Sequence, residues 1–451
     1  MNQQIKQRIE QVNNGQVPTG YKETEFGIFP CDWVTDKTFG DLFSFNGGLG
    51  KSREELSENG IEYLHYGDMH RSDFNIASLE QYSKLPKYDT KIKGDESFLM
   101  QDGDVAFLDA SEDLEGTSRS VLIDNPENKP FIAGLHIIYG KPRGKELSKY
   151  YKQYLTRPEY IKKQFKKLAS GFKVYGLNRN TITGIKCAYP KSTAEQEKIA
   201  EILMKWDEAI VLYNRQIEKL KQLKSVCIKK MFPKKRSKVP EVRFKGFTKD
   251  WEQRKLSDIA TMHARIGWQN LRTSEFLDSG DYMLITGTDF NDGAVNYSTC
   301  HFVEKERYEQ DKHIQIKNGS ILITKDGTLG KVAYVQGLSM PATLNAGVFN
   351  VEIKDETKVD NKYLFQYLKA PFLMDYVDKK ATGGTIKHLN QNILIDFPVV
   401  MPSKAEQEAI GVYFEQLDNI ITLHQRKVEK IKIQQKALQQ YLLNGIVRVN
   451  V

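Results

Sequence analysis

The residues most suggestive of chemistry form a glycine-rich stretch, Phe45-Asn46-Gly47-Gly48-Leu49-Gly50-Lys51-Ser52. It ends like a loop that cradles nucleotide phosphates, but that loop needs a glycine five places before Gly50, where this chain has Phe45. It also falls short of the Phe-x-Gly-x-Gly loop that binds S-adenosylmethionine, because Leu49 occupies the final glycine position. The stretch therefore predicts neither nucleotide hydrolysis nor methyl transfer.

A wider search of the sequence finds no catalytic constellation. No two prolines are adjacent, as an amino-methyltransferase loop requires, and no proline precedes aspartate, as in the common two-carboxylate nuclease site. Asp207-Glu208-Ala209-Ile210 has the outline of a helicase box but lies inside a helical pattern. The eight histidines show no metal-ligand spacing, and the scattered Cys31, Cys187, Cys227 and Cys300 indicate reduced, packed thiols. We expect no metal and no cofactor in this chain, and a binding or scaffolding role.

The charge and the hydrophobic content of the chain limit the classes of partner that it can have. The chain has 451 residues, is 27% charged and 40% hydrophobic, and carries a formal net charge of +8. A basic balance favours a polyanionic partner, although many basic proteins bind no nucleic acid. No apolar run approaches the roughly 18–20 residues of a membrane helix, and the N-terminus lacks the apolar stretch of a signal peptide. A cytoplasmic location is expected.

The elements that must position any binding residues occur twice. Ala194-Glu195-Gln196-Glu197 and Ala405-Glu406-Gln407-Glu408 each open a long segment with apolar residues at alternating steps of four and three, the seam of a coiled coil. The polar Lys224 and Gln435 interrupt the two seams at the same layer, at the common offset of 211. The spacing predicts two long helices that pair antiparallel along Ile199, Leu203, Trp206, Ile210, Tyr213, Ile217 and Leu220, and Ile410, Phe414, Leu417, Ile421, His424, Val428 and Ile431.

Further pairs of segments extend the repeat to the whole chain. Short β-branched and aromatic runs between turn residues follow Asp32-Trp33 and again Asp250-Trp251. The predicted fold is therefore α+β, with two pseudo-symmetric, mostly β globular domains joined by two long antiparallel helices. The expected boundaries are 1–190 for the first domain, 191–232 for the first helix, 233–241 for a linker, 242–401 for the second domain and 402–446 for the second helix.

Glycine-containing loops that carry basic and polar side chains are the candidate nucleic-acid contacts. Such loops can approach phosphates closely and still send side chains to base edges. An ordinary surface charge is an equal alternative for any single residue, so the prediction concerns the cluster. The candidates are Lys51, Arg53, Gly171, Lys173, Tyr175 and Arg179 in the first half, and Arg265, Trp268, Lys325, Thr328, Lys331, Gly384, Thr385 and Lys387 in the second.

The chain resembles the specificity subunit of Type I restriction–modification enzymes. The resemblance rests on the two Ala-Glu-Gln-Glu openings, the two Asp-Trp segments, the Leu-Asn-x-Asn stretches at 177–180 and 389–392, and Ile323 to Lys331. It implies two target recognition domains that read the halves of a bipartite, asymmetric DNA site. It also implies two modification subunits, which bind S-adenosylmethionine and methylate adenine, docked on the paired helices, with restriction subunits joining.

The same resemblance implies a subunit without catalytic activity of its own, in agreement with the motif search. The two halves depart from each other where Leu108-Asp109-Ala110-Ser111 stands against Thr324-Lys325-Asp326-Gly327, as expected if they read different sequences. Two alternatives stay open: a fused DNA methyltransferase or nuclease, and a coiled-coil scaffold without DNA readout.

Overall fold

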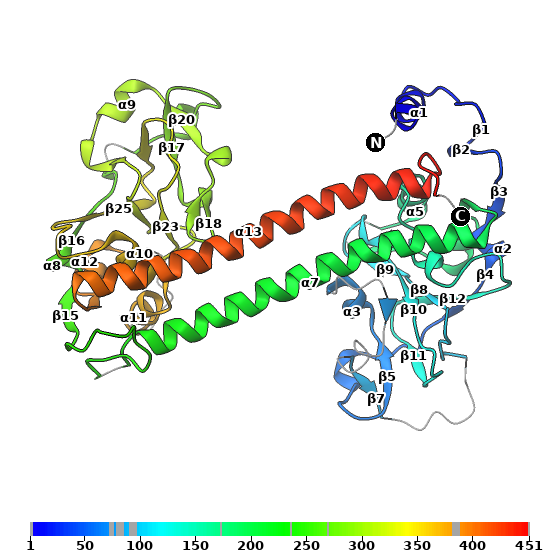
Figure 1. The fold of residues 1–451 in the computed structure, drawn as a ribbon, viewed down its shortest axis with the longest axis horizontal. Coiled ribbons are helices and arrows are strands. Elements are labelled where there is room, and N and C mark those ends of the chain that lie inside the picture. The colour runs from blue at the N-terminus through cyan, green and yellow to red at the C-terminus, as the bar shows by residue number, and fades with distance from the viewer. Residues whose placement is uncertain are drawn as a thin grey trace. The chain divides into compact units, whose positions relative to one another are not determined.

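The computed structural model describes residues 3–71, 76–77, 85–89, 97–171, 174–234, 237–267, 270–380 and 388–449. The chain forms two compact units: unit 1 comprises residues 1–215 and 426–451, and unit 2 comprises residues 216–425. The long helices α7 (Thr193–Met231) and α13 (Lys404–Leu443) each contribute one segment to each unit (Figure 1). The predicted α+β class with two long helices is confirmed, but the C-terminal residues belong to unit 1, which linear domain boundaries do not express.

Each unit is built on a central mixed sheet and a smaller second sheet. In unit 1 the central order is β4 (Phe43–Gly47), β12 (Ile137–Pro142), β8 (Val105–Leu108), β10 (Ser120–Ile123) and β6 (Ile76–Ala77), and the second sheet is β11 (Phe131–Ala133), β5 (Ile61–Leu64) and β7 (Lys87–Tyr88). In unit 2 the central order is β16 (Ala260–His263), β25 (Val348–Ile353), β22 (Ile321–Thr324), β23 (Val332–Tyr334), β19 (Ala294–Val295) and β18 (Phe290–Asn291). Its second sheet is β20 (His301–Val303), β17 (Tyr282–Ile285), β24 (Ala342–Leu344) and β21 (Gln315–Ile316).

The remaining elements connect these sheets to the helices. Unit 1 adds α1 (Gln3–Asn13), β1 (Tyr21–Thr24), β2 (Gly27–Pro30), β3 (Trp33–Thr38), α2 (Phe39–Leu42), η1 (Arg53–Glu55), α3 (Tyr66–Arg71), β9 (Ala110–Ser111), η2 (Gly116–Ser118), η3 (Tyr150–Tyr154), α5 (Glu159–Leu168), β13 (Tyr175–Gly176), α6 (Arg179–Thr183) and β14 (Lys186–Pro190). Unit 2 adds β15 (Glu252–Lys255), α8 (Leu256–Ile259), η5 (Thr273–Glu275), η6 (Gly287–Asp289), η7 (Tyr297–Thr299), α9 (Lys305–Glu309), η8 (Lys312–Ile314), α10 (Asn361–Lys369), α11 (Phe372–Lys380), α12 (Gln391–Ile395) and β26 (Pro398–Met401).

The repeated Asp-Trp segments lie at the base of the long helices. β3, which begins at Trp33, pairs antiparallel with β14, the strand that leads into α7. In the same way β15, which follows Trp251, pairs with β26, the strand that leads into α13. Both tryptophans are buried in the core of their unit. The Asp-Trp repeat is therefore a structural base for the helix that follows each domain.

The Ala-Glu-Gln-Glu openings join each helix to its own domain. Buried Gln196 donates to the carbonyls of Glu146 and Pro190, both at 2.8 Å, and Gln407 donates to those of Lys358 and Pro402, both at 3.0 Å. The preceding glutamates are also buried. Because a buried polar group is costly unless it is hydrogen-bonded, these bonds fix the direction in which each helix leaves its domain.

Each buried glutamate pairs with an arginine that follows the opposite helix. Arg448, beyond the end of α13, donates to both carboxylate oxygens of Glu195, at 2.6 and 2.8 Å, and also to Asp32. Arg243, beyond the end of α7, donates to both oxygens of Glu406, at 2.6 and 2.7 Å. The Arg448 guanidinium beside Asp32 holds the pKa of that carboxyl below its usual value. In each unit, the glutamate at the start of one long helix thus binds the segment that follows the end of the other long helix.

The predicted seam residues are all buried or half-buried, and in both units the α7 and α13 segments run in opposite directions (Figure 1). The polar seam residues contact one aspartate each. In unit 2 Lys224 donates to both oxygens of Asp418, at 2.6 and 2.7 Å, and in unit 1 Gln435 donates to Asp207 at 2.7 Å. Burial in this layer lowers the pKa of the Lys224 ammonium, a shift that Asp418 opposes. The same polar layer therefore occurs in both units with different donors.

The Asp418→Ala substitution should destabilise unit 2 by about 3–5 kcal/mol, because it leaves the buried Lys224 ammonium without its partner. Lys224→Gln, which installs the donor used in unit 1, should cost only about 1 kcal/mol. Hydrogen exchange of the full chain, resolved by peptide, measures both changes. Equal losses in the two variants would contradict the layer's role.

The Arg448→Ala substitution should loosen unit 1, and Arg243→Ala should loosen unit 2, each by about 3 kcal/mol, because a buried glutamate loses its bidentate partner. The matched control is Arg254→Ala, since Arg254 pairs with Glu252 on the surface and should leave exchange unchanged. Peptide-resolved hydrogen exchange separates the units. Faster exchange in both units from either single variant would refute the assignment.

Candidate nucleic-acid interface

The glycine-rich stretch of unit 1 is a tightly packed loop beyond β4. Gly48 donates to the Ile137 carbonyl at 2.8 Å, and a Cβ at Gly48 would lie 2.0 Å from the Gly134 carbonyl oxygen. The buried Tyr63 hydroxyl accepts from the Lys51 amide at 3.1 Å and donates to the Leu49 carbonyl at 2.5 Å. The glycines therefore allow close approach of backbones, and they explain why the stretch only resembles a phosphate loop.

Two of the candidate basic residues project from the end of this loop. Lys51 forms an ion pair with Glu55 at 2.9 Å, and Arg53 forms one with Asp68 at 3.0 Å. Half of the Arg53 side-chain surface is exposed. The Lys51 pair is open to solvent, and such ion pairs contribute little to stability, so Lys51 can exchange its carboxylate partner for a phosphate at small cost.

The other described candidates of unit 1 lie near β13. Tyr175 is half-buried and pairs with Ser111 of β9, while Gly171 has φ +130°. Arg179 is exposed at the start of α6, with its guanidinium carbon 4.0 Å from the Cβ position of Gly47. Arg179 is therefore beside the end of β4, from which the Lys51 loop departs. Lys173 lies outside the described residues.

In unit 2 the turn between β22 and β23 presents Lys325, Thr328 and Lys331. Gly327 and Gly330 have φ of +72° and +70°, the left-handed conformation that glycine adopts without strain. The buried Thr324 hydroxyl accepts from the Lys331 amide at 3.0 Å and donates to the Thr328 carbonyl. This turn holds Thr328 and Lys331 exposed, while the Lys325 ammonium lies 5.4 Å from the centre of the Phe349 ring.

The prediction for Arg265 needs correction, because its side chain is inside unit 2. Only 1% of Arg265 is exposed, and its guanidinium donates to the Leu344 carbonyl and to Gln310 Oε1, both at 3.0 Å. It anchors the segment after β16 to the α9 region and does not face solvent. Trp268, Gly384, Thr385 and Lys387 lie outside the described residues.

Two histidine–aspartate pairs at these loops were missed from the sequence. His136 Nδ1 lies 2.8 Å from Asp109 in unit 1, and His388 Nδ1 lies 2.6 Å from Asp326 in unit 2. His136 has φ +61°, an uncommon conformation for a residue other than glycine. The partners are far apart in the chain, so no local pattern could reveal them.

The Leu-Asn-x-Asn stretches are joints at the same loops. The Leu177 amide donates to the Asp109 carbonyl at 2.7 Å, and the Leu389 amide donates to the Lys325 carbonyl at 2.8 Å. Both leucines are buried, and Asn178 caps α6 by accepting from the Thr181 amide. The stretches thus hold the end of β8 or β22 in place beside the basic loops.

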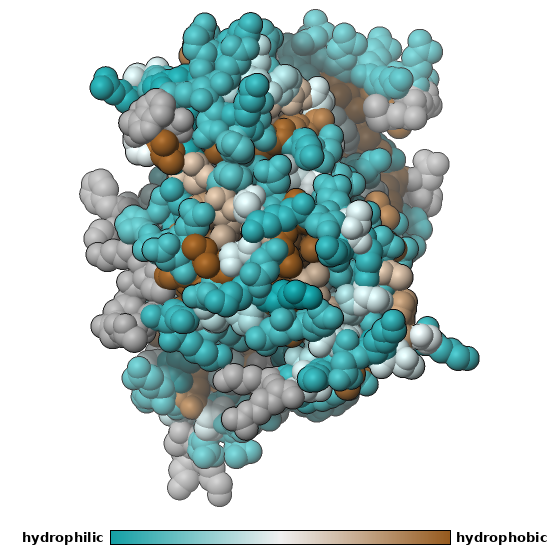
Figure 2. All heavy atoms as spheres, turned by 90° about the vertical axis from the view of Figure 1, so that its left-hand side faces the viewer, coloured by the Kyte–Doolittle hydropathy of each residue, from teal (hydrophilic) through white to brown (hydrophobic). Residues whose placement is uncertain are grey.

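One face of the protein is mainly polar. Figure 2, which turns the left-hand side of Figure 1 toward the viewer, shows a predominantly hydrophilic face with hydrophobic residues in small groups. Among the residues that the structure describes, no helix is both long and apolar enough to cross a membrane.

Comparison with known proteins places the chain in a family. A family model described as the Type I restriction modification DNA specificity domain matches residues 30–222 and 248–433, so the chain belongs to that family. It is a specificity subunit with two DNA-recognition domains, as the resemblance predicted.

Individual relatives agree with this family. The putative type I restriction enzyme MjaX specificity subunit of Methanocaldococcus jannaschii is 23% identical over 95% of this chain and 97% of its own length. The MjaVIII specificity subunit of the same organism is 26% identical over 66% of this chain and 70% of its own length. The crystal structure of the S subunit from M. genitalium shares the fold, with a TM-score of 0.58 at 15% identity, over 91% of this chain and 96% of that one.

Proposed function

We propose that the chain reads a bipartite, asymmetric DNA site, with one half-site bound by each unit. The observation that carries the proposal is that corresponding residues of the two units make the same kind of backbone hydrogen bond but have side chains of opposite charge. The Asp109 amide donates to the His136 carbonyl at 3.1 Å in unit 1, and the Lys325 amide donates to the Gly347 carbonyl at 2.9 Å at the corresponding place in unit 2. An acidic residue thus occupies in one unit the position of a lysine in the other.

This difference in charge supports asymmetry. A carboxylate accepts from the cytosine amino group in the major groove, whereas a lysine donates to guanine acceptors or to phosphate. Side chains of opposite charge at equivalent backbone positions of the two units are suited to recognising two different half-site sequences. Phosphate and base contacts around them come from the half-buried Lys51 and from the exposed Arg53, Arg179, Thr328 and Lys331.

The chain acts without catalytic activity of its own, as a scaffold in the cytoplasm for modification subunits that carry S-adenosylmethionine, and for restriction subunits. Support for the partner surface comes from leucines on the long helices. Leu212 and Leu423 occupy corresponding positions at the offset of 211, and 56% and 64% of their surfaces are exposed. Exposed apolar patches mark contact surfaces for other proteins, and we place the partner surface at these two repeated leucines.

Selection from random duplexes by the chain with its modification subunit should return a split motif with a fixed gap, and binding should weaken steeply as salt rises. Lys325→Asp should then change preference in one half-site by about 1–3 kcal/mol, and Asp109→Lys in the other half-site only. The control is Lys198→Ala on α7, where no change is expected. A single unsplit motif, or both half-sites altered by one variant, would contradict the proposal.

Leu212→Glu and Leu423→Glu should each reduce the number of modification subunits bound, and the double variant should bind none, because a charge replaces apolar contact area. Mass photometry of the purified complexes counts the subunits. Val239→Glu, an exposed apolar residue outside the helices, is the matched control. If the double variant still bound the full number of modification subunits, the partner surface would not include Leu212 and Leu423.

A further inference from the structure

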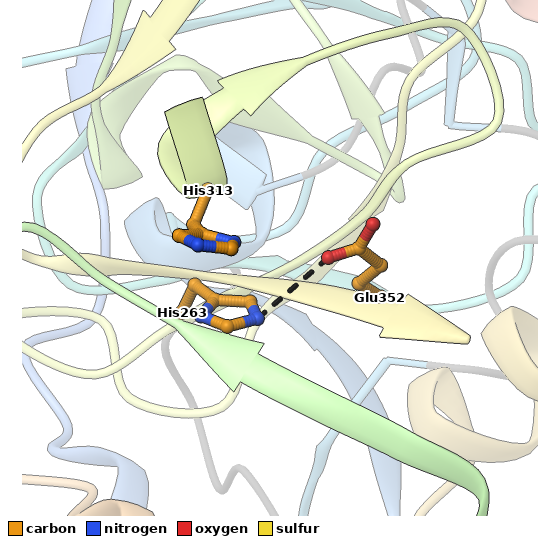
Figure 3. A group of neighbouring side chains, drawn as sticks. All are labelled: His263, His313 and Glu352. Atoms are coloured by element: carbon orange, nitrogen blue, oxygen red, sulfur yellow. Dashed lines mark ion pairs between the residues drawn. The ribbon is translucent and has the colours of Figure 1, made fainter. Parts of the chain in front are cut away.

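Three side chains of unit 2 meet at the edge of its central sheet, away from the residues assigned above (Figure 3). They are His263 at the end of β16, Glu352 in β25 and His313 in η8. One ligand atom from each of the three lies within 4.8 Å of the others. We propose that His263, His313 and Glu352 bind a divalent transition-metal ion of the zinc class.

The sheet register places two of the ligands on one face. β16 and β25 are antiparallel, with Thr261 opposite Glu352 and His263 opposite Asn350. Directly opposite residues share a face of the sheet, and alternate residues along a strand return to it. His263 Nε2 therefore lies only 3.6 Å from a carboxylate oxygen of Glu352, as the dashed line in Figure 3 marks.

The third ligand is held by two hydrogen bonds of its own backbone. The His313 amide donates to the Asp311 carboxylate at 2.9 Å, and the His313 carbonyl accepts from the Asn350 side chain at 3.0 Å. The next residue, Ile314, is fully buried and anchors the short helix. As a result the His313 ring lies over the His263 ring, with the ring centres 4.5 Å apart and the planes inclined by 19°.

The chemistry of this set suits zinc. Two neutral imidazoles and one carboxylate form a ligand set of catalytic zinc sites, in which water takes the fourth position. Bonds of about 2.0–2.2 Å put two ligand atoms of a tetrahedral ion roughly 3.3–3.6 Å apart. The His263–Glu352 separation already has this value, and His313 and Glu352 are exposed and free to rotate the short remaining distance.

Unit 1 has the same frame with residues that cannot bind a metal in this way. There β4 pairs with β12 so that Ser44 is opposite Lys141 and Asn46 is opposite Tyr139. The Tyr139 hydroxyl donates to the Ser97 carbonyl, as the Asn350 amide does to that of His313. The three ligand positions are therefore Asn46, Ser97 and Lys141 in unit 1. Unit 1 keeps this frame without any of the three ligands.

A bound ion would link η8 to the two strands at a point next to Arg265. The Arg265 guanidinium already ties the segment after β16 to Gln310, two residues before η8. The ion would add a second tie between these segments. It would therefore stabilise unit 2 alone, and this inference does not depend on what the loops bind.

The test is zinc titration of the full chain after removal of metals with EDTA, by calorimetry and by peptide-resolved hydrogen exchange. One ion per chain is expected, with slower exchange in unit 2 only. His263→Asn, His313→Ser and Glu352→Lys, the residues found in unit 1, should each weaken binding at least about tenfold. His301→Asn, an exposed histidine outside the cluster, should leave it unchanged.

Cobalt provides an independent reading, because Co²⁺ in a tetrahedral nitrogen and oxygen site gives strong visible absorption that these three variants should lose. Hydrogen exchange without metal verifies that the variants are folded, and the exposed positions of His313 and Glu352 favour this. Absence of binding by Zn²⁺, Ni²⁺ and Co²⁺ at millimolar concentration would overturn the proposal and leave a stacked histidine pair. Binding that survives in all three variants would also overturn it.

Discussion

The rest of the structure depends on one half-buried carboxylate in each unit. In unit 1 Asp207 of α7 accepts from Gln435 of α13 at 2.7 Å, from Tyr154 at 3.0 Å and from Arg157 at 3.1 Å. In unit 2 Asp418 of α13 accepts from Lys224 of α7 and, at 2.8 Å, from Gln366. Each aspartate thus gathers donors from the other helix and from the globular domain. A polar group at one seam layer fixes helix register, because any slip would leave it buried without its partner.

This constraint explains why the repeated motifs are structural. The glutamine and glutamate of each helix opening, the tryptophan of each Asp-Trp segment and the leucine of each Leu-Asn-x-Asn stretch all lie in joints between domain and helix or strand and loop. Half-buried side chains at the same loops, such as Asp109 and Lys325, differ between the units. The motifs identify the family because their residues hold the backbone frame, whereas the side chains to which we assign DNA readout differ between the two units.

The sequence predicted the helices, the repeat and the fold class because these depend on local periodicity. It predicted the loops less well, because their geometry depends on long-range bonds. Arg265 illustrates this: a glycine and several basic residues nearby indicated a surface loop, but the carbonyls that surround its guanidinium come from distant segments. The sequence predicted no metal site for the same reason. His263, His313 and Glu352 come from two strands and a short helix, so their positions in the sequence show no metal-ligand spacing.

The division of the chain also sets the order in which the units can be completed. Unit 2 is one continuous stretch, whereas unit 1 needs residues 426–451, including Arg448, which bonds to a residue 416 positions earlier. Closing so large a loop costs little more entropy than closing a shorter one, since the cost rises with the logarithm of length. The contacts that compensate for the entropy of closing this loop, however, include those between the C-terminal part of α13 and α7. A complete unit 1 therefore includes the C-terminal part of α13 packed against α7, in addition to its globular domain.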